Sequence, residues 1–166
     1  MKDVQDEQFI VVNENDEIVG YKTRFECHHN RTYIHRAVDV ALFNQEGKLI
    51  FQKRSTQKDL YPGYFTLSST GHVSKGEMYE QAAARELKEE MGVEHILLKR
   101  ISTFLVPAKS EIEMITLFTG SHNGPYIFPK DEVESIHYFS PKEINSVRDT
   151  ITPSSLQSLK VLKIIL

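Results

Sequence analysis

Short apolar runs recur along this chain at spacings that predict mostly β-structure. Residues 9–13 and 16–20 flank Glu14 and Asn15, and they predict a short hairpin over residues 8–22. Further runs of alternating apolar and polar residues predict strands at 35–43, 48–54, 64–69, 96–106, 112–119 and 134–139. Most of these strands are separated by short turns.

The period changes to that of a helix over residues 78–91. Apolar side chains recur there every four residues and predict a buried face made of Tyr79, Ala83, Leu87 and Met91. Gly92 follows directly as a C-terminal stop. Ser140 and Pro141 predict a second helix start, and an amphipathic helix is expected at about residues 153–165.

One long helix among strands, with other helices near the end, predicts an α+β fold in which helices pack on a mixed β-sheet. The 166 residues contain no repeat, low-complexity tract or linker, so a single domain is expected over residues 1–166. With 40% hydrophobic and 26% charged residues, the composition is that of a soluble globular protein.

Charge and cysteine content exclude several classes of function. A net charge of −3 gives no basic footprint, so no nucleic-acid partner is expected. One cysteine, Cys27, excludes an intramolecular disulfide framework and fits a reducing compartment. The polar N-terminus does not resemble a signal peptide, and no apolar run approaches the roughly 20 residues that span a bilayer. A cytoplasmic protein with no membrane partner is therefore expected.

Three carboxylates lie on one face of the predicted long helix. Glu86 and Glu90 are four residues apart, and Glu89 lies beside them. Their mutual repulsion would be relieved by a hard divalent cation, and Mg²⁺ or Mn²⁺ prefers such oxygen ligands. Arg85 precedes them and can fix one carboxylate, while Gly71 is expected in a bending loop before the helix. The alternative is an ordinary surface helix with solvated charges.

The order of residues in this segment favours the metal site. With U an aliphatic residue, the segment from Gly71 to Val93 reads G-x5-E-x7-R-E-U-x-E-E-x-G-U. From average residue frequencies, a chance match has a probability on the order of 10⁻¹⁰ per starting position. This pattern resembles the signature of the Nudix hydrolase family.

The resemblance implies an α/β/α sandwich and hydrolysis of a nucleoside diphosphate linked to another group. It implies that Glu86, Glu89 and Glu90 bind Mg²⁺ or Mn²⁺, with the Gly71 carbonyl as a further ligand. Arg85 would orient a glutamate. The catalytic residues expected on this basis are Glu90, Glu89, Arg85 and a general base.

Outside the signature, the chain resembles the Nudix branch that contains the type I isopentenyl-diphosphate isomerases. The segments that carry this likeness are His35-Arg36-Ala37, residues 58–63 (KDLYPG) and Thr70-Gly71-His72. The resemblance implies a second site for Mn²⁺ or Zn²⁺, with the ligands His28, His35, His72, Glu111 and Glu113. Against it, His28 would ordinarily be a solvated loop histidine, and the two glutamates a solvated strand face.

Isomerisation itself fits less well than hydrolysis. The isomerases use a cysteine where this chain has Thr70, and they shield a carbocation with a tryptophan that this chain lacks. Hydrolysis is therefore the favoured prediction, and isomerisation is the alternative. A non-catalytic nucleotide-binding module is a third possibility, although such a module would be expected to lose signature carboxylates.

The remaining predictions concern the substrate. Glu113 is the preferred general base, ahead of Glu111, Glu132 and Glu134. Lys53 and Arg54 are candidates for binding a terminal phosphate, or else an ordinary solvated strand end. The expected partner is a small diphosphate or nucleotide. The apolar terminal helix is expected to cover the sheet, and the protein to be a monomer or a homodimer.

Overall fold

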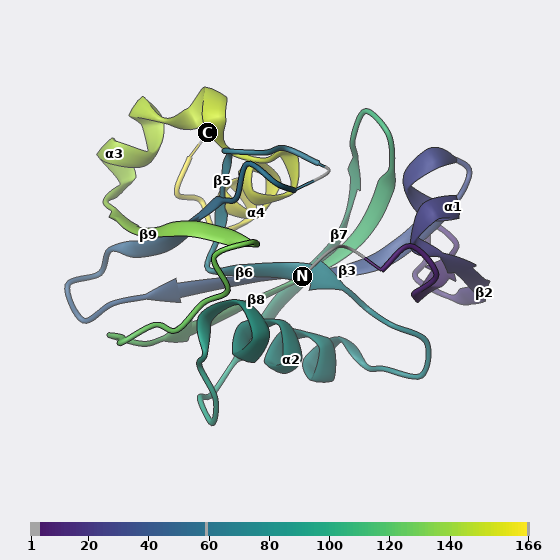
Figure 1. The fold of residues 1–166 in the computed structure, drawn as a ribbon, viewed down its shortest axis with the longest axis horizontal. Helices are drawn as coiled ribbons and strands as arrows, with labels where there is room; N and C mark the ends of the chain where they lie inside the picture. Colours follow the sequence, from purple (N-terminus) through teal and green to yellow (C-terminus); the bar gives the residue numbers. More distant parts are fainter. Residues whose placement is uncertain (1–3, 59, 166) are drawn as a thin grey trace.

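The computed structural model describes residues 4–58 and 60–165. Its helices are α1 (Arg24–His29), α2 (Tyr79–Met91), α3 (Pro141–Ser146) and α4 (Pro153–Val161), with a 3₁₀ turn at Arg148–Thr150. Its strands are β1 (Gln8–Val12), β2 (Ile18–Thr23), β3 (Ile34–Phe43), β4 (Leu49–Arg54), β5 (Phe65–Leu67), β6 (Ser69–His72), β7 (Lys99–Pro107), β8 (Ile112–Ser121) and β9 (Val133–Phe139). The predicted hairpin, long helix and terminal helices are present (Figure 1).

Strand β3 organises the sheet. It pairs antiparallel with β1, β4 and β6, and it pairs parallel with β8 over its whole length, from Ile34 opposite Ile112 to Phe43 opposite Ser121. Strands β7 and β9 extend the sheet from β8 and β4. The mixed sheet that the sequence predicts is confirmed.

Helices cover both faces of this sheet (Figure 1). On one face, Leu87 and Met91 of α2 pack with Val38 of β3, and all three are at most 1% exposed. On the other face, Leu159 of α4 packs with Phe51 of β4. The C-terminal helix therefore covers the sheet, as its apolar positions predict.

Helix α1 was not predicted. Its N-terminus is a capping box, because Thr23 Oγ1 accepts from the Glu26 amide at 3.2 Å and Glu26 Oε2 accepts from the Thr23 amide at 2.9 Å. The Thr-x-x-Glu spacing is a sequence signal for a helix start. It brings His28 into a buried position, 6% exposed, so the alternative of a solvated loop histidine is wrong.

The predicted single strand at 64–69 is two strands. Strand β5 pairs with β4 and β6 pairs with β3, and Ser68 lies between them. Ser68 Oγ accepts from the Leu42 amide at 2.8 Å and donates to the Ile50 carbonyl at 2.7 Å, so its side chain bridges the two pairings. As a result Gly71 lies in a strand, not in the loop where it was expected.

The last helix also differs from the prediction. It ends at Val161 and not near residue 165, because Leu162 caps it and Lys163 takes a left-handed conformation at φ +58°. Ile165 still packs into the same core as Leu159.

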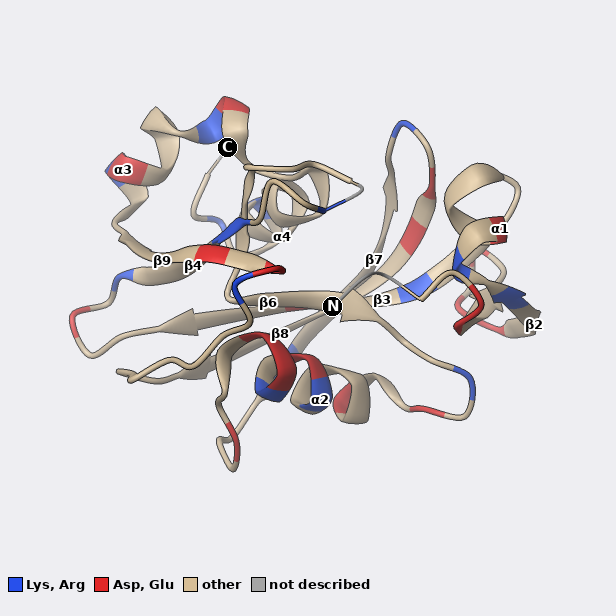
Figure 2. Cartoon of the chain, viewed as in Figure 1, with Lys and Arg blue, Asp and Glu red and all other residues tan. Residues whose placement is uncertain are grey.

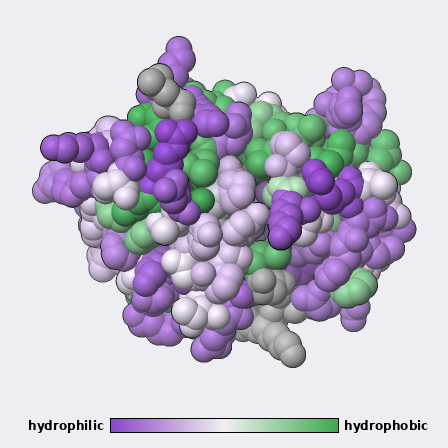
Figure 3. All heavy atoms as spheres, turned by 90° about the horizontal axis from the view of Figure 1, so that it is seen from above, coloured by the Kyte–Doolittle hydropathy of each residue, from purple (hydrophilic) through white to green (hydrophobic). Residues whose placement is uncertain are grey.

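Charged residues of both signs are spread over the fold. Lys and Arg are interspersed with Asp and Glu along the chain (Figure 2). On the face seen in Figure 3, hydrophobic patches lie between hydrophilic side chains. In the described part of the chain, every helix is too short or too polar to span a bilayer.

Candidate active site

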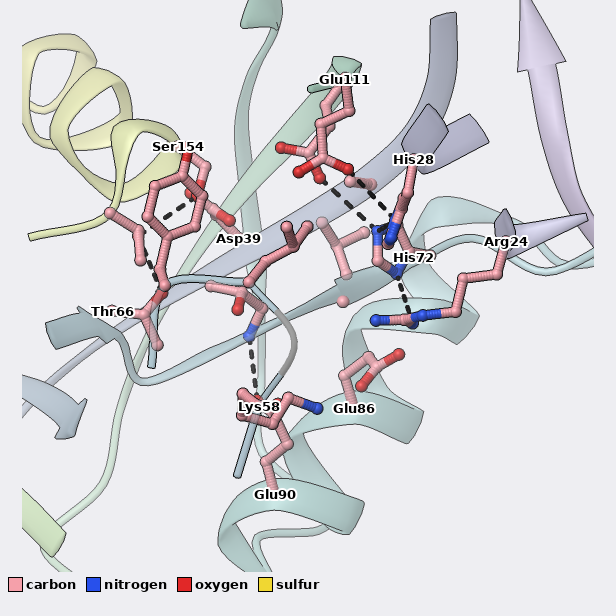
Figure 4. Close-up of a pocket in the computed structure, with 18 of the residues that line it drawn as sticks. Arg24, His28, Asp39, Lys58, Thr66, His72, Glu86, Glu90, Glu111 and Ser154 are labelled. Atoms are coloured by element: carbon pink, nitrogen blue, oxygen red, sulfur yellow. Dashed lines mark hydrogen bonds and ion pairs between the residues drawn. The ribbon is translucent and has the colours of Figure 1, made fainter. Parts of the chain in front are cut away.

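A cavity of about 600 Å³ opens between α2, β6 and the start of α4. Figure 4 shows Glu86 and Glu90 of α2 on one side of it, with His28, His72 and Glu111 on another. Most of the predicted site residues, although they come from widely separated segments, therefore line one space; Lys53 and His35 are not among the described residues that line it.

The glutamate cluster consists of Glu86, Glu89 and Glu90, and all three line this cavity together with Gly71. Glu90 is 8% exposed, whereas the Glu89 side chain is 58% exposed at the mouth. Burial, and then the neighbouring Glu90 charge, raises the pKa of Glu86. Burial also raises the pKa of Glu90. A cation among these oxygens would relieve both effects.

Two neutral donors hold Glu90 in place. Gln52 Nε2 donates to Glu90 Oε2 at 2.9 Å, and the Thr70 amide donates to the same oxygen at 3.1 Å. Gln52 is 2% exposed, and its amide also donates to the Ser68 carbonyl at 2.5 Å. Both of these bonds fall on Glu90 Oε2, so they fix the carboxylate against β4 and β6.

Arg85 ties the helix to the preceding segment. It contacts Glu77 at 2.7 and 2.9 Å, Glu86 at 2.7 Å and the His72 carbonyl at 2.9 Å. These contacts, Glu77 first, raise the pKa of its guanidinium, so the charge is permanent. Arg85 also lies 3.3 Å from Glu89, but its other three partners distinguish it from a simple surface pair.

Gly71 is required by close packing. A Cβ added at Gly71 would overlap the carboxyl group of Glu86. The position therefore admits only glycine if Glu86 is to keep its place against β6.

The histidine cluster consists of His28, His35, His72 and Glu111, whose candidate ligand atoms lie within 4.8 Å of one another. Glu111 Oε2 lies 3.1 Å from His28 Nε2 and 3.7 Å from His35 Nε2. The Nε2 atoms of His28 and His72 lie 3.3 Å apart. Glu113 joins at the edge, with Oε1 3.7 Å from His72 Nε2.

Two imidazoles of this cluster, those of His35 and His72, are held in the neutral form by burial. Burial, followed by the His28 and Arg24 charges, lowers the pKa of His35 to about 3. Burial, and then Arg24, lowers the pKa of His72 well below its usual value. Neither ring nitrogen of His35 has a hydrogen-bond partner among the described residues. Buried neutral imidazoles with available lone pairs, beside a carboxylate, are donors suited to Mn²⁺ or Zn²⁺.

Glu113, the predicted general base, is also in the cavity wall. Burial, and then Glu111 and Asp39, raises its pKa well above the usual value. Glu132 lines the mouth, whereas Glu134 is engaged by Lys53 at 2.9 Å. The choice of base stays a prediction.

Lys53 and Arg54, the predicted phosphate-binding pair, point in different directions. Arg54 lines the cavity, and its Nε donates to the Leu60 carbonyl at 3.2 Å. Lys53 points elsewhere, to Glu134, and is not among the described residues that line the cavity. Two cations that the sequence analysis did not assign to phosphate line it instead: Arg24 and Lys58. The neighbour of Lys58 in the predicted motif, Asp59, lies outside the described residues.

The structure also gives the positions of Thr70 and Cys27, the two residues that bear on the choice between hydrolysis and isomerisation. Thr70 lines the cavity next to Gly71, at the position where the isomerases use cysteine. Cys27 is fully buried in a separate cluster with Phe9 and Val11, and burial raises the pKa of its thiol to about 12. Cys27 is therefore not available in the cavity as a substitute for the missing thiol.

Three residues of this site were missed from the sequence. Arg24 is the first residue of α1, inside the capping box that was not recognised, so its position depends on a helix that was not predicted. Asp39 interrupts an apolar run in β3, and Gln52 follows one in β4, and a buried polar residue at such a position is a signal for a special role.

The comparisons with known proteins agree with this geometry. Residues 33–161 match the NUDIX domain family. PA4841 of Pseudomonas aeruginosa, an uncharacterized Nudix hydrolase, is 31% identical over 152 residues, covering 90% of this chain and 89% of that protein. Isopentenyl-diphosphate delta-isomerase 2 of Homo sapiens is 38% identical over 101 residues, 53% of this chain and 44% of that protein.

A solved structure extends the likeness to the whole fold. The crystal structure of DR0079 from Deinococcus radiodurans is 25% identical and has a TM-score of 0.80, over 96% of this chain and all (100%) of that one. The similarity to the isomerase agrees with the isomerase-like motifs, although that protein is matched over only part of its length. With the family matched over most of the sequence, the chain belongs to the Nudix hydrolase family.

Proposed function

We propose that this protein is a Mg²⁺-dependent pyrophosphohydrolase that cleaves the phosphoanhydride bond of a nucleoside diphosphate linked to another group, or of a related diphosphate. The observation that supports it most is the intact glutamate cluster, which lines one side of a cavity that Arg24, Arg54 and Lys58 also line. Carboxylates that could bind a metal ion and basic side chains that could bind phosphate therefore line the same cavity.

The residues present fit such an ion. Glu86 and Glu90 are close enough that the charge of one raises the pKa of the other, and Gly71 leaves room for them against β6. Glu86, Glu89, Glu90 and the Gly71 carbonyl would hold Mg²⁺ or Mn²⁺. When bound there, the ion would neutralise phosphate oxygens and lower the pKa of a water molecule.

The chain's own residues supply orientation and proton transfer. Gln52 and Thr70 fix the Glu90 carboxylate, and Arg85 fixes Glu86. Arg54 and Lys58 would bind the diphosphate. Glu113, buried and with a raised pKa, is the candidate to accept the proton of the attacking water.

Glu90→Gln tests the proposal. We expect Mg²⁺-dependent release of phosphate or nucleoside monophosphate from a panel of nucleotides, nucleotide sugars and isoprenoid diphosphates to fall by roughly 10²–10⁴-fold. Glu86→Gln should reduce it less. The matched control is Glu80→Gln, on the same helix but exposed and paired with Arg100, which should keep full activity. Full activity in Glu90→Gln would remove that residue from the mechanism.

Isopentenyl-diphosphate isomerisation is the second candidate, because the histidine cluster is assembled as that resemblance implies. Its residues would hold a second Mn²⁺ or Zn²⁺, with Glu113 at the edge. Thr70 speaks against it, since a hydroxyl does not replace the acidity of a thiol. The test is conversion of isopentenyl diphosphate to dimethylallyl diphosphate by the native chain and by Thr70→Cys. If neither converts it, isomerisation is excluded.

A non-catalytic nucleotide-binding module is a third candidate. It predicts binding without turnover and no metal at the glutamate cluster. A crystal soaked in millimolar Mn²⁺ distinguishes it, because anomalous density among Glu86, Glu89 and Glu90 would favour the enzyme. The cytoplasmic location and the state as monomer or homodimer stay predictions.

A further inference from the structure

One wall of the cavity differs from the rest and has no part in the roles proposed so far. It is formed by the middle of β3, by β5 and by the start of α4 (Figure 4). Four side chains with oxygen atoms line the cavity there: Asp39, Thr66, Thr152 and Ser154. Here these four residues are called the oxygen wall.

Asp39 is the unusual member of the oxygen wall. It is 1% exposed, in the middle of a strand whose neighbours are apolar. Ser158 Oγ of α4 donates to Asp39 Oδ2 at 2.6 Å. Its second oxygen, Oδ1, makes no hydrogen bond within the part of the chain that the structure describes. A buried carboxylate with one donor is costly unless further donors reach it, and the cavity is the direction from which they can come.

The other members form a chain of hydroxyl groups. Thr66 Oγ1 lies 2.9 Å from Ser155 Oγ and 3.3 Å from Thr152 Oγ1, and Thr152 Oγ1 lies 3.5 Å from Ser154 Oγ. Thr66 and Thr152 are at most 4% exposed. Hydroxyl groups held in this way both donate and accept, so they suit a partner that does the same.

Hydrocarbon would be a poor neighbour for this wall. A prenyl chain placed against Asp39 would displace water and provide no donor, so the carboxylate would be left with the Ser158 hydroxyl as its donor. A sugar hydroxyl can donate to the carboxylate and accept from a threonine or serine. A site built to hydrogen-bond a hydroxyl rejects analogues that lack one.

We propose that the oxygen wall is a specificity subsite, with Asp39 as its central acceptor, for a hydroxyl-bearing group such as the sugar of a diphosphate substrate. This inference rests on the proposed function for the position of the diphosphate. It narrows the substrate class to sugar- or polyol-bearing diphosphates and disfavours isoprenoid diphosphates.

Binding tests the subsite separately from turnover. The dissociation constants of ADP-ribose, isopentenyl diphosphate and inorganic pyrophosphate are measured by calorimetry, with Ca²⁺ in place of Mg²⁺. The native chain should bind the sugar-bearing ADP-ribose at least about tenfold more tightly than isopentenyl diphosphate. Equal or reversed affinities would overturn the proposal.

The double variant Asp39→Leu/Ser158→Ala removes both partners of the buried pair, so no donor is left unsatisfied. It should lose the preference for ADP-ribose and keep the affinity for pyrophosphate. Asp39→Asn, which still accepts from Ser158, should lose part of the preference with an unchanged melting temperature. Thr116→Val is the control, because it removes a buried hydroxyl, bonded to Thr103 at 2.8 Å, that does not line the cavity.

The outcomes separate the two proposals. If all three ligands weaken equally in the Asp39 variants, Asp39 only supports the fold and the subsite is wrong. If the preference is present and is lost as expected, but Mg²⁺ produces no hydrolysis of any substrate, the hydrolase proposal fails while the subsite stands.

Discussion

The glutamate cluster and the histidine cluster face the same cavity but are built in opposite ways. The glutamate cluster comes from one helix, at positions i, i+3 and i+4, and its negative charges repel one another in the absence of a cation. The histidine cluster comes from α1, β3, β6 and the segment before β8, and burial favours the neutral form of His35 and His72. The two donor sets would suit ions of different chemistry: a hard ion at the glutamates and a nitrogen-preferring ion at the histidines.

Among the variants that test the glutamate cluster against the histidine cluster, Gly71→Ala is expected to have the largest effect on activity. The new methyl group would occupy the position of the Glu86 carboxyl group and displace it. We expect Mg²⁺-dependent activity to fall by roughly 100-fold, since a displacement of about 1 Å at the reacting site has that cost. A steady-state assay at several Mg²⁺ concentrations checks it.

The control for Gly71→Ala is Gly20→Ala, where a Cβ meets nothing within 4 Å. That variant should keep full activity. If Gly71→Ala were as active as Gly20→Ala, the packing of Glu86 against β6 would have no importance for catalysis.

The next effect concerns the orientation of Glu90. Gln52→Leu removes the donor to Glu90 Oε2 while keeping a similar volume. We expect kcat to fall by roughly 10–100-fold, and the Mg²⁺ concentration for half-maximal activity to rise, because the loss of an outer hydrogen bond to a ligand typically has that size. The exposed Gln45→Leu is the control. A lower melting temperature with unchanged metal dependence would instead assign Gln52 a structural role.

His28→Ala tests the histidine cluster separately from the glutamate cluster. It removes one ligand of the histidine cluster and leaves the glutamates untouched, so binding of Mn²⁺ or Zn²⁺ should drop by one ion per chain. Mg²⁺-dependent hydrolysis should change only a few fold if the two clusters work separately. Metal content after dialysis, with the exposed His29→Ala as control, measures this. Loss of both ions together would show that the clusters form one centre.

These two clusters also mark how far the sequence could predict the site. The spacing of Glu86, Glu89 and Glu90 defines a helix face by itself, so that cluster could be predicted from local pattern. His28, His35 and His72 are brought together only by α1 and by the pairing of β3 with β6. Periodicity contains no information on such contacts, and only the resemblance to the isomerases pointed to them.

The fold likewise contains elements that local pattern predicts and elements that depend on contacts between distant residues. The long helix could be predicted because apolar spacing and a glycine stop agree, and Gly92 does take the left-handed conformation at φ +65°. The break between β5 and β6 could not, because it depends on Ser68 bonding to Leu42 and Ile50, which are distant in sequence. The position of Asp39 in the cavity could not be predicted either, because it depends on the packing of the distant helix α4 beside β3.

The smallest effect is expected from Thr23→Ala. It removes the side-chain acceptor of the α1 capping box and should lower the free energy of unfolding by about 1 kcal/mol. Denaturant unfolding measures it, with the exposed Thr56→Ala as a neutral control. Since α1 contains His28, the histidine cluster should bind its metal more weakly in this variant, whereas the glutamate cluster should not respond.

Strand β6 has a consequence for how this site can change. Its consecutive residues Thr70, Gly71 and His72 touch Glu90, make room for Glu86 and contribute to the histidine cluster. A shift of this strand by one residue would therefore disturb both clusters at once. The glutamate cluster can change separately through α2 and β4, and the histidine cluster through α1, β3 and the β7–β8 hairpin, whereas a change in β6 affects both.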